Sequence, residues 1–308
     1  MKQINFNRIN VFWLACLLFA VYIFPATAQR QNEAARFYDK AVEAHSRHKF
    51  DEAVEHYRAA IRAAPNFAEA YNNLGNVLAE LKRYAEAVAA LERAIQIKPD
   101  YAEAYNNTGV VFTESNDYRR AVGFFKQAID IRPDYVLAYN NIGKAYLNLS
   151  LYDQALTAFQ KAAEFRPKDA AVQHNLGFAY LKIGDYRAAV ESLKSAILLK
   201  PNYLAAHNDL GVAYWKSGFY QTAAESFRQA ISLDYNCAEA RLNLGLLSLS
   251  QNEIGAAQEQ YAILRELNSE TAETLLKAIN SLCYLSRINY HLFQTFGYKK
   301  LRSSATQT

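Results

Sequence analysis

The sequence predicts an all-α fold in which short helix-turn-helix pairs stack into an array behind an N-terminal export signal. Three observations predict it. Five prolines recur every 34 residues, six glycines recur with the same period, and apolar residues between them recur at spacings of three and four. A period of this length is typical of an array in which each repeat is one supersecondary unit.

Residues 1–28 are predicted to be a cleaved signal peptide. Lys2 and Arg8 precede an apolar run over 11–24, and the small residues at 25–28 provide a peptidase site. The run is shorter than the roughly 20 residues that a membrane-spanning helix needs. We therefore expect an exported protein, periplasmic or secreted. The alternative is an uncleaved segment that anchors the protein to a membrane.

Glycine and alanine mark the helices of each repeat. The glycines lie within apolar helical patterns, where glycine costs about 1 kcal/mol relative to alanine. They are Gly75, Gly109, Gly143, Gly177, Gly211 and Gly245. We expect a neighbouring helix to approach closely at each glycine. The matching small residues in the second half of each repeat are Ala53, Ala87, Ala121, Ala155, Ala189, Ala223 and Ala257.

An aromatic residue follows the short polar stretch in the middle of each repeat. The series is Phe50, Tyr84, Tyr118, Tyr152, Tyr186 and Tyr220. These stretches are predicted turns between two helices of about 13 residues. Helices that short are marginal alone, so stacking of neighbouring pairs must bury their apolar faces. The repeats themselves end near Pro65, Pro99, Pro133, Pro167 and Pro201.

This order of residues at a period of 34 resembles the tetratricopeptide repeat, and the segment 68–76 matches it closely. The resemblance covers 34–271 and implies a right-handed superhelical solenoid with a C-terminal capping helix. The predicted repeats are 34–67, 68–101, 102–135, 136–169, 170–203, 204–237 and 238–271. A lead-in at 29–33 precedes them, and a capping helix at 272–297 and a flexible tail at 298–308 follow.

The capping helix is predicted from its amphipathic pattern, which begins with Leu275, Leu276 and Ile279 and would cover the last repeat. Cys237 is predicted at the mouth of one helix and Cys283 more than two turns along another. That separation exceeds the reach of a disulfide, so we expect both thiols to be free.

The first helices of the repeats should line a concave groove that holds an extended peptide. Two adjacent phases carry amides. The first phase is Asn73, Asn107, Asn141, Asn175, Asp209 and Asn243, and the second is Asn72, Asn106, Asn140, His174, Asn208 and Leu242. The predicted groove comprises Asn73, Asn107, Asn141, Asn175, Asn208 and Asn243. An amide offers both a donor and an acceptor to a peptide backbone. Alternatively, these asparagines serve helix packing or hydration.

Amide contacts alone are too weak to hold a peptide. Five contacts at about 1 kcal/mol each give roughly 5 kcal/mol, and association entropy costs an estimated 4 to 15 kcal/mol. Anchors are predicted on the same stripe at Lys144, Phe178, Lys182, Trp215 and Lys216. Trp215 is the main candidate, with packing against the next helix as the alternative. Towards the N-terminus the stripe is acidic, at Glu69, Glu80, Glu103 and Glu114.

The sequence carries no pattern of catalysis, and we expect neither a cofactor nor a metal site. The histidines lack the spacing of a metal-binding helix, and there is no phosphate loop or nucleophile elbow. With 34 basic and 30 acidic residues interspersed, nothing predicts nucleic-acid binding, nor is there a small-molecule site. The predicted function is a non-catalytic protein-binding scaffold. The alternative is a structural subunit of an envelope or secretion complex, docked through its convex face or C-terminal helix.

Overall fold

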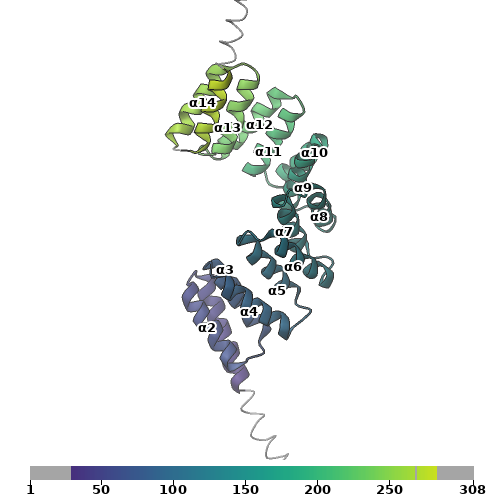
Figure 1. The fold of residues 1–308 in the computed structure, drawn as a ribbon, viewed down its shortest axis with the longest axis vertical. Coiled ribbons are helices and arrows are strands. Elements are labelled where there is room, and N and C mark those ends of the chain that lie inside the picture. The colour runs from purple at the N-terminus through teal and green to yellow at the C-terminus, as the bar shows by residue number, and fades with distance from the viewer. Residues whose placement is uncertain (1–28, 268, 283–308) are drawn as a thin grey trace, which may run out of the picture. The chain divides into compact units, whose positions relative to one another are not determined.

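The computed structural model describes residues 29–267 and 269–282, and throughout that part of the chain the regular secondary structure is helical (Figure 1). The predicted all-α fold of helix-turn-helix pairs is thereby confirmed. In chain order the helices are one over 29–46, α2 (Phe50–Ala63), α3 (Ala68–Glu80), α4 (Tyr84–Ile97), α5 (Ala102–Glu114), α6 (Tyr118–Ile131), α7 (Val136–Asn148), α8 (Tyr152–Phe165), α9 (Ala170–Ile183), α10 (Tyr186–Leu199), α11 (Leu204–Lys216), α12 (Tyr220–Leu233), α13 (Ala238–Ser250), α14 (Ile254–Glu266) and one over 271–282.

Both ends of the described chain differ in detail from the predicted divisions. Residues 29–33, predicted as a lead-in, are helical and continuous with the rest of the first helix, because they contain no glycine or proline to interrupt it. The predicted signal peptide, the capping helix beyond residue 282, the tail and Cys283 lie outside the described residues. Cys237 is a free, half-buried thiol immediately before α13.

The described chain forms two compact units divided between residues 158 and 159, which we call the N-terminal half and the C-terminal half. The division falls within α8. In each half, the two helices of a repeat pack against one another, as α3 does with α4 and α11 with α12. Second helices also pack against the first helix of the next repeat, as α4 does with α5 and α12 with α13. The apolar core is divided into clusters along each half, with fully buried side chains such as Phe125 in the N-terminal half and Phe227 in the C-terminal half. Stacking thus replaces a single central core.

The repeated glycines lie where two helices approach closely, as predicted. A Cβ atom on Gly75 would lie 2.5 Å from Cγ of Leu91, and one on Gly109 would lie 2.6 Å from the ring of Phe125. The same contact recurs at Gly177 with Leu193 (2.7 Å) and at Gly211 with Phe227 (2.5 Å). The residue over each of these glycines is therefore a large side chain from the second helix of the same repeat. The phased alanine assists, since the carbonyl oxygen of Ala87 would lie 3.2 Å from the same Cβ on Gly75.

The turn inside each repeat requires one residue with positive φ. These residues are His48, Lys82, Asn116, Ser150, Gly184, Gly218 and Asn252, with φ between 58° and 84°. A residue with a side chain is strained in this region by roughly 1 to 2 kcal/mol, whereas glycine is not. The C-terminal half has glycine at two of its three turns, and the described turns of the N-terminal half have none.

The last described helix completes the packing of the seventh repeat. A Cβ on Gly245 would lie 2.6 Å from Cδ2 of Leu275, which comes from the helix over 271–282 and not from α14. Leu275 is fully buried and Ile279 is 4% exposed, and both pack against Leu249 and Leu264. Leu275 therefore occupies the place that a large side chain of the second helix takes in the earlier repeats.

Candidate functional site

The first helices of successive repeats lie closer together than the second helices do. In the N-terminal half α3 contacts α5, and α5 contacts α7; in the C-terminal half α9 contacts α11, and α11 contacts α13. Successive second helices make no contacts of that extent in the described chain. The first helices therefore line the inner surface of each half, and the second helices form the outer surface.

In the N-terminal half, the two amide phases of the inner surface are hydrogen-bonded from one repeat to the next. Asn73 Nδ2 donates to Tyr38 OH (2.8 Å), Asn107 Nδ2 donates to Asn72 Oδ1 (2.9 Å) and Asn141 Nδ2 donates to Asn106 Oδ1 (3.0 Å). Within a repeat, Asn72 Nδ2 donates to Asn73 Oδ1 (3.0 Å) and Asn106 Nδ2 donates to Asn107 Oδ1 (3.3 Å). We call these six side chains, from Tyr38 to Asn141, the amide chain. It ties three repeat interfaces together.

The C-terminal half makes the equivalent bonds with different groups. His174 Nε2 lies 2.8 Å from Asp209 Oδ2, and these side chains are only 14% and 11% exposed. Asn243 Nδ2 donates to Asn208 Oδ1 (2.9 Å), and Tyr203 OH lies 3.3 Å from His174 Nδ1. A histidine and a carboxylate thus replace two amides without loss of the tie between repeats.

These bonds fit the alternative interpretation of the asparagines, in which they serve helix packing. Asn73, Asn107, Asn141, Asn175 and Asn243 are half-buried on the inner surface. Asn208 belongs to the buried phase, with an exposed fraction of 2%, and is not available to a partner as the groove prediction required. The residue in phase with the other five is Asp209, which is 8% exposed.

The predicted lysine and aromatic anchors come together in the C-terminal half. Lys182 Nζ lies 4.8 Å from the ring centroid of Phe178, and Lys216 Nζ lies 5.6 Å from that of Trp215. Both lysines are exposed, both rings are half-buried, and neither ammonium group forms an ion pair with a described carboxylate. Trp215 packs against the cluster that contains Phe227, so its ring serves the core as well as the surface.

Lys144 is also exposed, but it lies on α7 in the N-terminal half.

Three inner acidic residues of the N-terminal half already have a partner within the fold. Glu69 pairs with Lys98 (3.8 Å), and Glu80 lies 2.8 Å from His45 Nε2. Glu103 accepts a hydrogen bond from Arg132. The acidic stripe predicted from the sequence is therefore largely neutralised within the fold.

Two acidic residues of this stripe, Glu103 and Glu114, have shifted pKa values. Burial raises the pKa of Glu103, but the hydrogen bond and charge of Arg132 outweigh burial, so its pKa lies below the usual value. Burial and the nearby charge of Glu80 raise the pKa of Glu114. The fold therefore disfavours the charged form of Glu114.

Sequence reasoning missed the stacked cations of the inner surface. Lys98 Nζ lies 4.7 Å from the ring centroid of Tyr101, and the Arg132 guanidinium lies 4.5 Å from that of Tyr135. Burial and nearby carboxylates raise the pKa of Tyr101 to about 12. The signal was available, since a basic residue precedes an aromatic one by three positions in both repeats.

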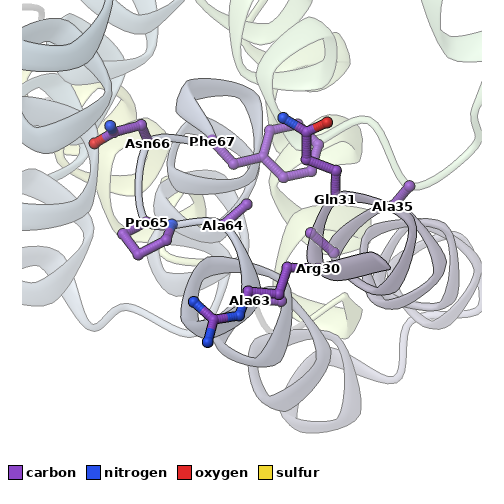
Figure 2. A pocket seen from close by; sticks show the side chains of 9 residues that line it. Arg30, Gln31, Ala35, Ala63, Ala64, Pro65, Asn66 and Phe67 are labelled. Carbon is purple, nitrogen blue, oxygen red and sulfur yellow. The ribbon is translucent and has the colours of Figure 1, made fainter. Parts of the chain in front are cut away.

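A hollow of about 580 Å³ lies at the N-terminal end of the array (Figure 2). Arg30, Gln31 and Ala35 from the first helix line one side, and residues 63–67 from the end of α2 and the following loop line the other. Four of the nine lining residues are alanine, and the polar ones are Arg30, Gln31 and Asn66. The polar ends of these three side chains point in different directions in Figure 2, so they do not converge on one small ligand.

The described residues contain neither a metal site nor a membrane-spanning helix. No group of three or more histidine, cysteine or acidic residues is arranged to hold a metal ion. Within 29–267 and 269–282, no helix combines the length and the apolar composition that spanning a bilayer requires.

Several solved structures share this fold. A tetratricopeptide repeat protein from Parabacteroides merdae ATCC 43184 has 18% identity and a TM-score of 0.63, with coverage of 80% of this chain and 99% of that chain. The APC/C Cut9–Hcn1 hetero-tetramer gives 18% identity and a TM-score of 0.62, over 82% of this chain but only 48% of that chain.

A third structure is YrrB, described as a TPR protein with an unusual peptide-binding site. It gives 22% identity and a TM-score of 0.53, over 61% of this chain and 97% of that chain. At these identities the likenesses show the fold alone. No curated protein matches this sequence.

Models of the repeat match the sequence itself. Those described as tetratricopeptide repeat match 66–134, 134–197 and 208–271, and one described as TPR repeat matches 43–82 and 180–218. Together they run without a gap over 43–271. The chain therefore belongs to the tetratricopeptide repeat family, whose members typically bind protein or peptide partners and are generally non-catalytic.

Proposed function

We propose that this protein is a non-catalytic scaffold that binds a protein segment on the inner surface of its C-terminal half. One observation carries the proposal. Lys182 and Lys216 form no ion pair with a described carboxylate, whereas Glu69 and Glu103 of the N-terminal half pair with Lys98 and Arg132. These two lysines therefore provide positive charge on the inner surface of the C-terminal half that a partner can neutralise.

The aromatic rings beside the lysines give this surface its apolar contacts. A cation over an exposed ring gains about 0.5 to 1 kcal/mol, which favours one position of each flexible lysine before a partner arrives. Exposed ion pairs add about 0.2 to 1 kcal/mol each, so most of the affinity must come from aromatic contact with Phe178 and Trp215. Aromatic residues of this kind dominate most measured interfaces.

The asparagines of the inner surface contribute in a secondary role. An amide has two N–H donors and an oxygen with two lone pairs. Asn107 uses one donor towards Asn72 and accepts one bond from Asn106. A second donor and a second lone pair remain for the backbone of a bound segment. The fold likeness to YrrB, a protein with a peptide-binding site, is consistent with such a role.

The test begins with a photoreactive amino acid at position 215 of the full-length protein in cells, compared with one at position 198 on the outer surface. Affinity for the captured partner is then measured for the double variant Lys182→Glu/Lys216→Glu. The matched control is Arg187→Glu/Arg228→Glu, which makes the same charge change at exposed positions of second helices. Loss of binding in the first variant alone supports the proposal, and equal binding by both variants rejects it.

A specific observation favours the outer surface as a second candidate. Leu198 on α10 is 84% exposed. The residues at its position in the other repeats are Arg62, Gln96, Asp130, Glu164, Ser232 and Glu266. A subunit of an envelope or secretion complex that docks through its outer surface would use Leu198. Crosslinking from position 198 but not from position 215, with affinity for the captured partner lost in a separate Leu198→Ser variant, would favour this function over groove binding.

Export to the periplasm or the medium completes the proposal. It is supported by the basic residues, apolar run and small residues of 1–28. Mass spectrometry of the purified native protein should find Gln29 as the first residue, and cell fractionation should place it outside the cytoplasm. An intact N-terminus in the membrane fraction would favour the anchored alternative.

A further inference from the structure

The turn between α11 and α12 exposes two adjacent aromatic side chains. Phe219 is 61% exposed and Tyr220 is 44% exposed. The counterparts of Tyr220 in the earlier repeats are Phe50, Tyr84, Tyr118, Tyr152 and Tyr186, all of them half-buried. The sixth repeat therefore presents apolar surface at a position where the earlier repeats partly cover it.

Phe219 lies at the N-cap position of α12, where a polar side chain can accept a hydrogen bond from the first turn. Asp117 accepts from Arg120 N (3.1 Å) and Asp185 accepts from Ala188 N (3.0 Å) at this position. Lys49, Arg83 and Glu253 form no such cap and neither does Phe219, but Phe219 differs from these three in being apolar.

The aromatic ring of Phe219 gains little within the fold in exchange. Its centroid lies 6.2 Å from that of Tyr214 in an edge contact, and most of its surface stays exposed. An apolar residue in place of a helix cap, with no compensating contact, is expected mainly at functional positions.

The charges around this turn are cationic on the inner side. Lys216 ends α11 directly before the turn and is exposed, without an ion pair to a described carboxylate. In the preceding repeat, the residue at the position of Phe219 is Asp185, whose carboxylate accepts a hydrogen bond from Ala188 N. In the following repeat, the residue at this position is Glu253. An apolar contact with a cation beside it is complementary to an acidic segment that contains an apolar residue.

We infer that Trp215, Lys216, Phe219 and Tyr220, which we call the turn patch, bind an acidic protein segment. An aromatic or aliphatic residue of that segment lies against Phe219 and Tyr220, while its carboxylates face Lys216 and Lys182. The inference rests on the proposed function, because it names the partner's chemistry and extends the inner surface to the turn.

The test uses the full-length protein and three fluorescein-labelled synthetic decapeptides. The first has four glutamates around a central Phe-Leu pair. The second replaces the glutamates by lysines, and the third replaces Phe-Leu by Ser-Ser. Fluorescence anisotropy should show that the first peptide binds at least tenfold more tightly than either of the others. Equal affinity for the acidic and basic peptides, or for the peptides with and without Phe-Leu, would overturn the inference.

Phe219→Ser is the decisive variant, because serine caps a helix and adds no charge. It should raise the melting temperature by a few degrees and lower the affinity for the acidic peptide at least tenfold. The matched control is Leu151→Ser, at the same position before α8. It should raise the melting temperature in the same way and leave affinity unchanged. Opposite signs for stability and binding separate a docking role from damage to the fold.

The outcomes distinguish this inference from the proposed function. If Phe219→Ser binds the acidic peptide like the unmodified protein, while Lys182→Glu/Lys216→Glu binds it at least tenfold more weakly, the inner surface stands and the turn patch is rejected. If both variants bind like the unmodified protein, both proposals are rejected. Weakening by both variants, with Leu151→Ser unaffected, supports both.

Discussion

The two halves of this molecule use the same helix pairs but satisfy their polar groups differently. In the N-terminal half, neutral amides tie the repeats together and Glu69, Glu80 and Glu103 are paired within the fold. In the C-terminal half, His174 and Asp209 replace two of the amides, and Lys182 and Lys216 lack acidic partners. The packing of a repeat therefore fixes where hydrogen bonds are needed, but leaves the surface charge free to serve a partner.

The largest expected effect comes from breaking the amide chain at its centre. Asn106 is 1% exposed, donates to Asn107 and accepts from Asn141, so Asn106→Ala removes two bonds and leaves their partners short of one each. We expect a loss of about 3 kcal/mol in unfolding free energy, measured by urea denaturation with circular dichroism.

The comparison variant for Asn106→Ala is Asn208→Ala in the C-terminal half. The bond from Asn208 to Asp209 is long, at 3.5 Å, so its loss should matter less. We expect about 2 kcal/mol there. A larger loss for Asn208→Ala would show that the amide chain is not the stronger tie.

A smaller effect should separate a glycine that lies opposite an aromatic ring from a glycine that lies opposite a leucine; each half contains both kinds. A Cβ on Gly109 would meet three atoms of the rigid Phe125 ring at 2.6 to 2.9 Å, whereas one on Gly177 meets the flexible side chain of Leu193. Overpacking costs about 1 to 3 kcal/mol, and alanine regains about 1 kcal/mol of helix propensity. Gly109→Ala should therefore lose about 2 kcal/mol and Gly177→Ala less than about 1 kcal/mol.

Hydrogen exchange of the amides in α5 and α9 is the measurement that localises these two losses. Equal acceleration of exchange in α5 by Gly109→Ala and in α9 by Gly177→Ala would contradict the distinction between a ring and a leucine.

Substitutions at the positive-φ residues of the turns should change the unfolding free energy in opposite directions in the two halves. Lys82 has a φ of 59°, so Lys82→Gly should relieve strain and raise unfolding free energy by about 1 kcal/mol. Gly218 has a φ of 83°, so Gly218→Ala should lower it by about the same amount. Thermal melts of both variants beside the unmodified protein check this, and a shift in the same direction for both would refute it.

The smallest effect concerns Glu114 and depends on pH. Because its folded pKa is raised, the charged form is disfavoured in the fold, and stability is gained as pH falls through that pKa. Glu114→Gln should therefore stabilise by less than about 0.5 kcal/mol at about pH 7 and have no effect at about pH 3.

Glu103→Gln is the matched variant, because the pKa of Glu103 is lowered by Arg132. Its carboxylate contributes stability that is present above the unfolded pKa and lost as pH falls through the folded one. Melts at both pH values should show it destabilising near pH 7. Stabilisation by both variants would mean that the two environments do not differ.

The regular features of the fold were predictable from the sequence, because they follow from positions that repeat. Close approach at Gly75 and Gly109 follows from glycine in a helical pattern. The identity of the opposing group does not, because Leu91 and Phe125 lie in a separate helix whose rotation the period leaves undetermined. Gly184 and Gly218 indicated a positive φ at the turns. The pattern was not recognisable from the sequence, because Lys82 occupies the same position in another repeat.

The site was less predictable, since it depends on pairings between repeats. Asn107 bonds to Asn72, 35 residues earlier, so the two amide phases are one structure and not two parallel rows. Trp215 combines the two roles that the sequence left open, because it packs against the next repeat and remains half-exposed. Phe219 is unremarkable in the sequence until the absence of a cap before α12 is seen.

Leu275 sets a lower limit on the length of any stable fragment of this protein. The seventh repeat does not fill the space over Gly245 by itself, and Leu275 does so from the following helix. A chain cut at the end of the repeat array would leave a leucine-sized void and the apolar faces of Leu249 and Leu264 open to water. Such a fragment would aggregate through that end, and one extended beyond Ile279 would stay monodisperse.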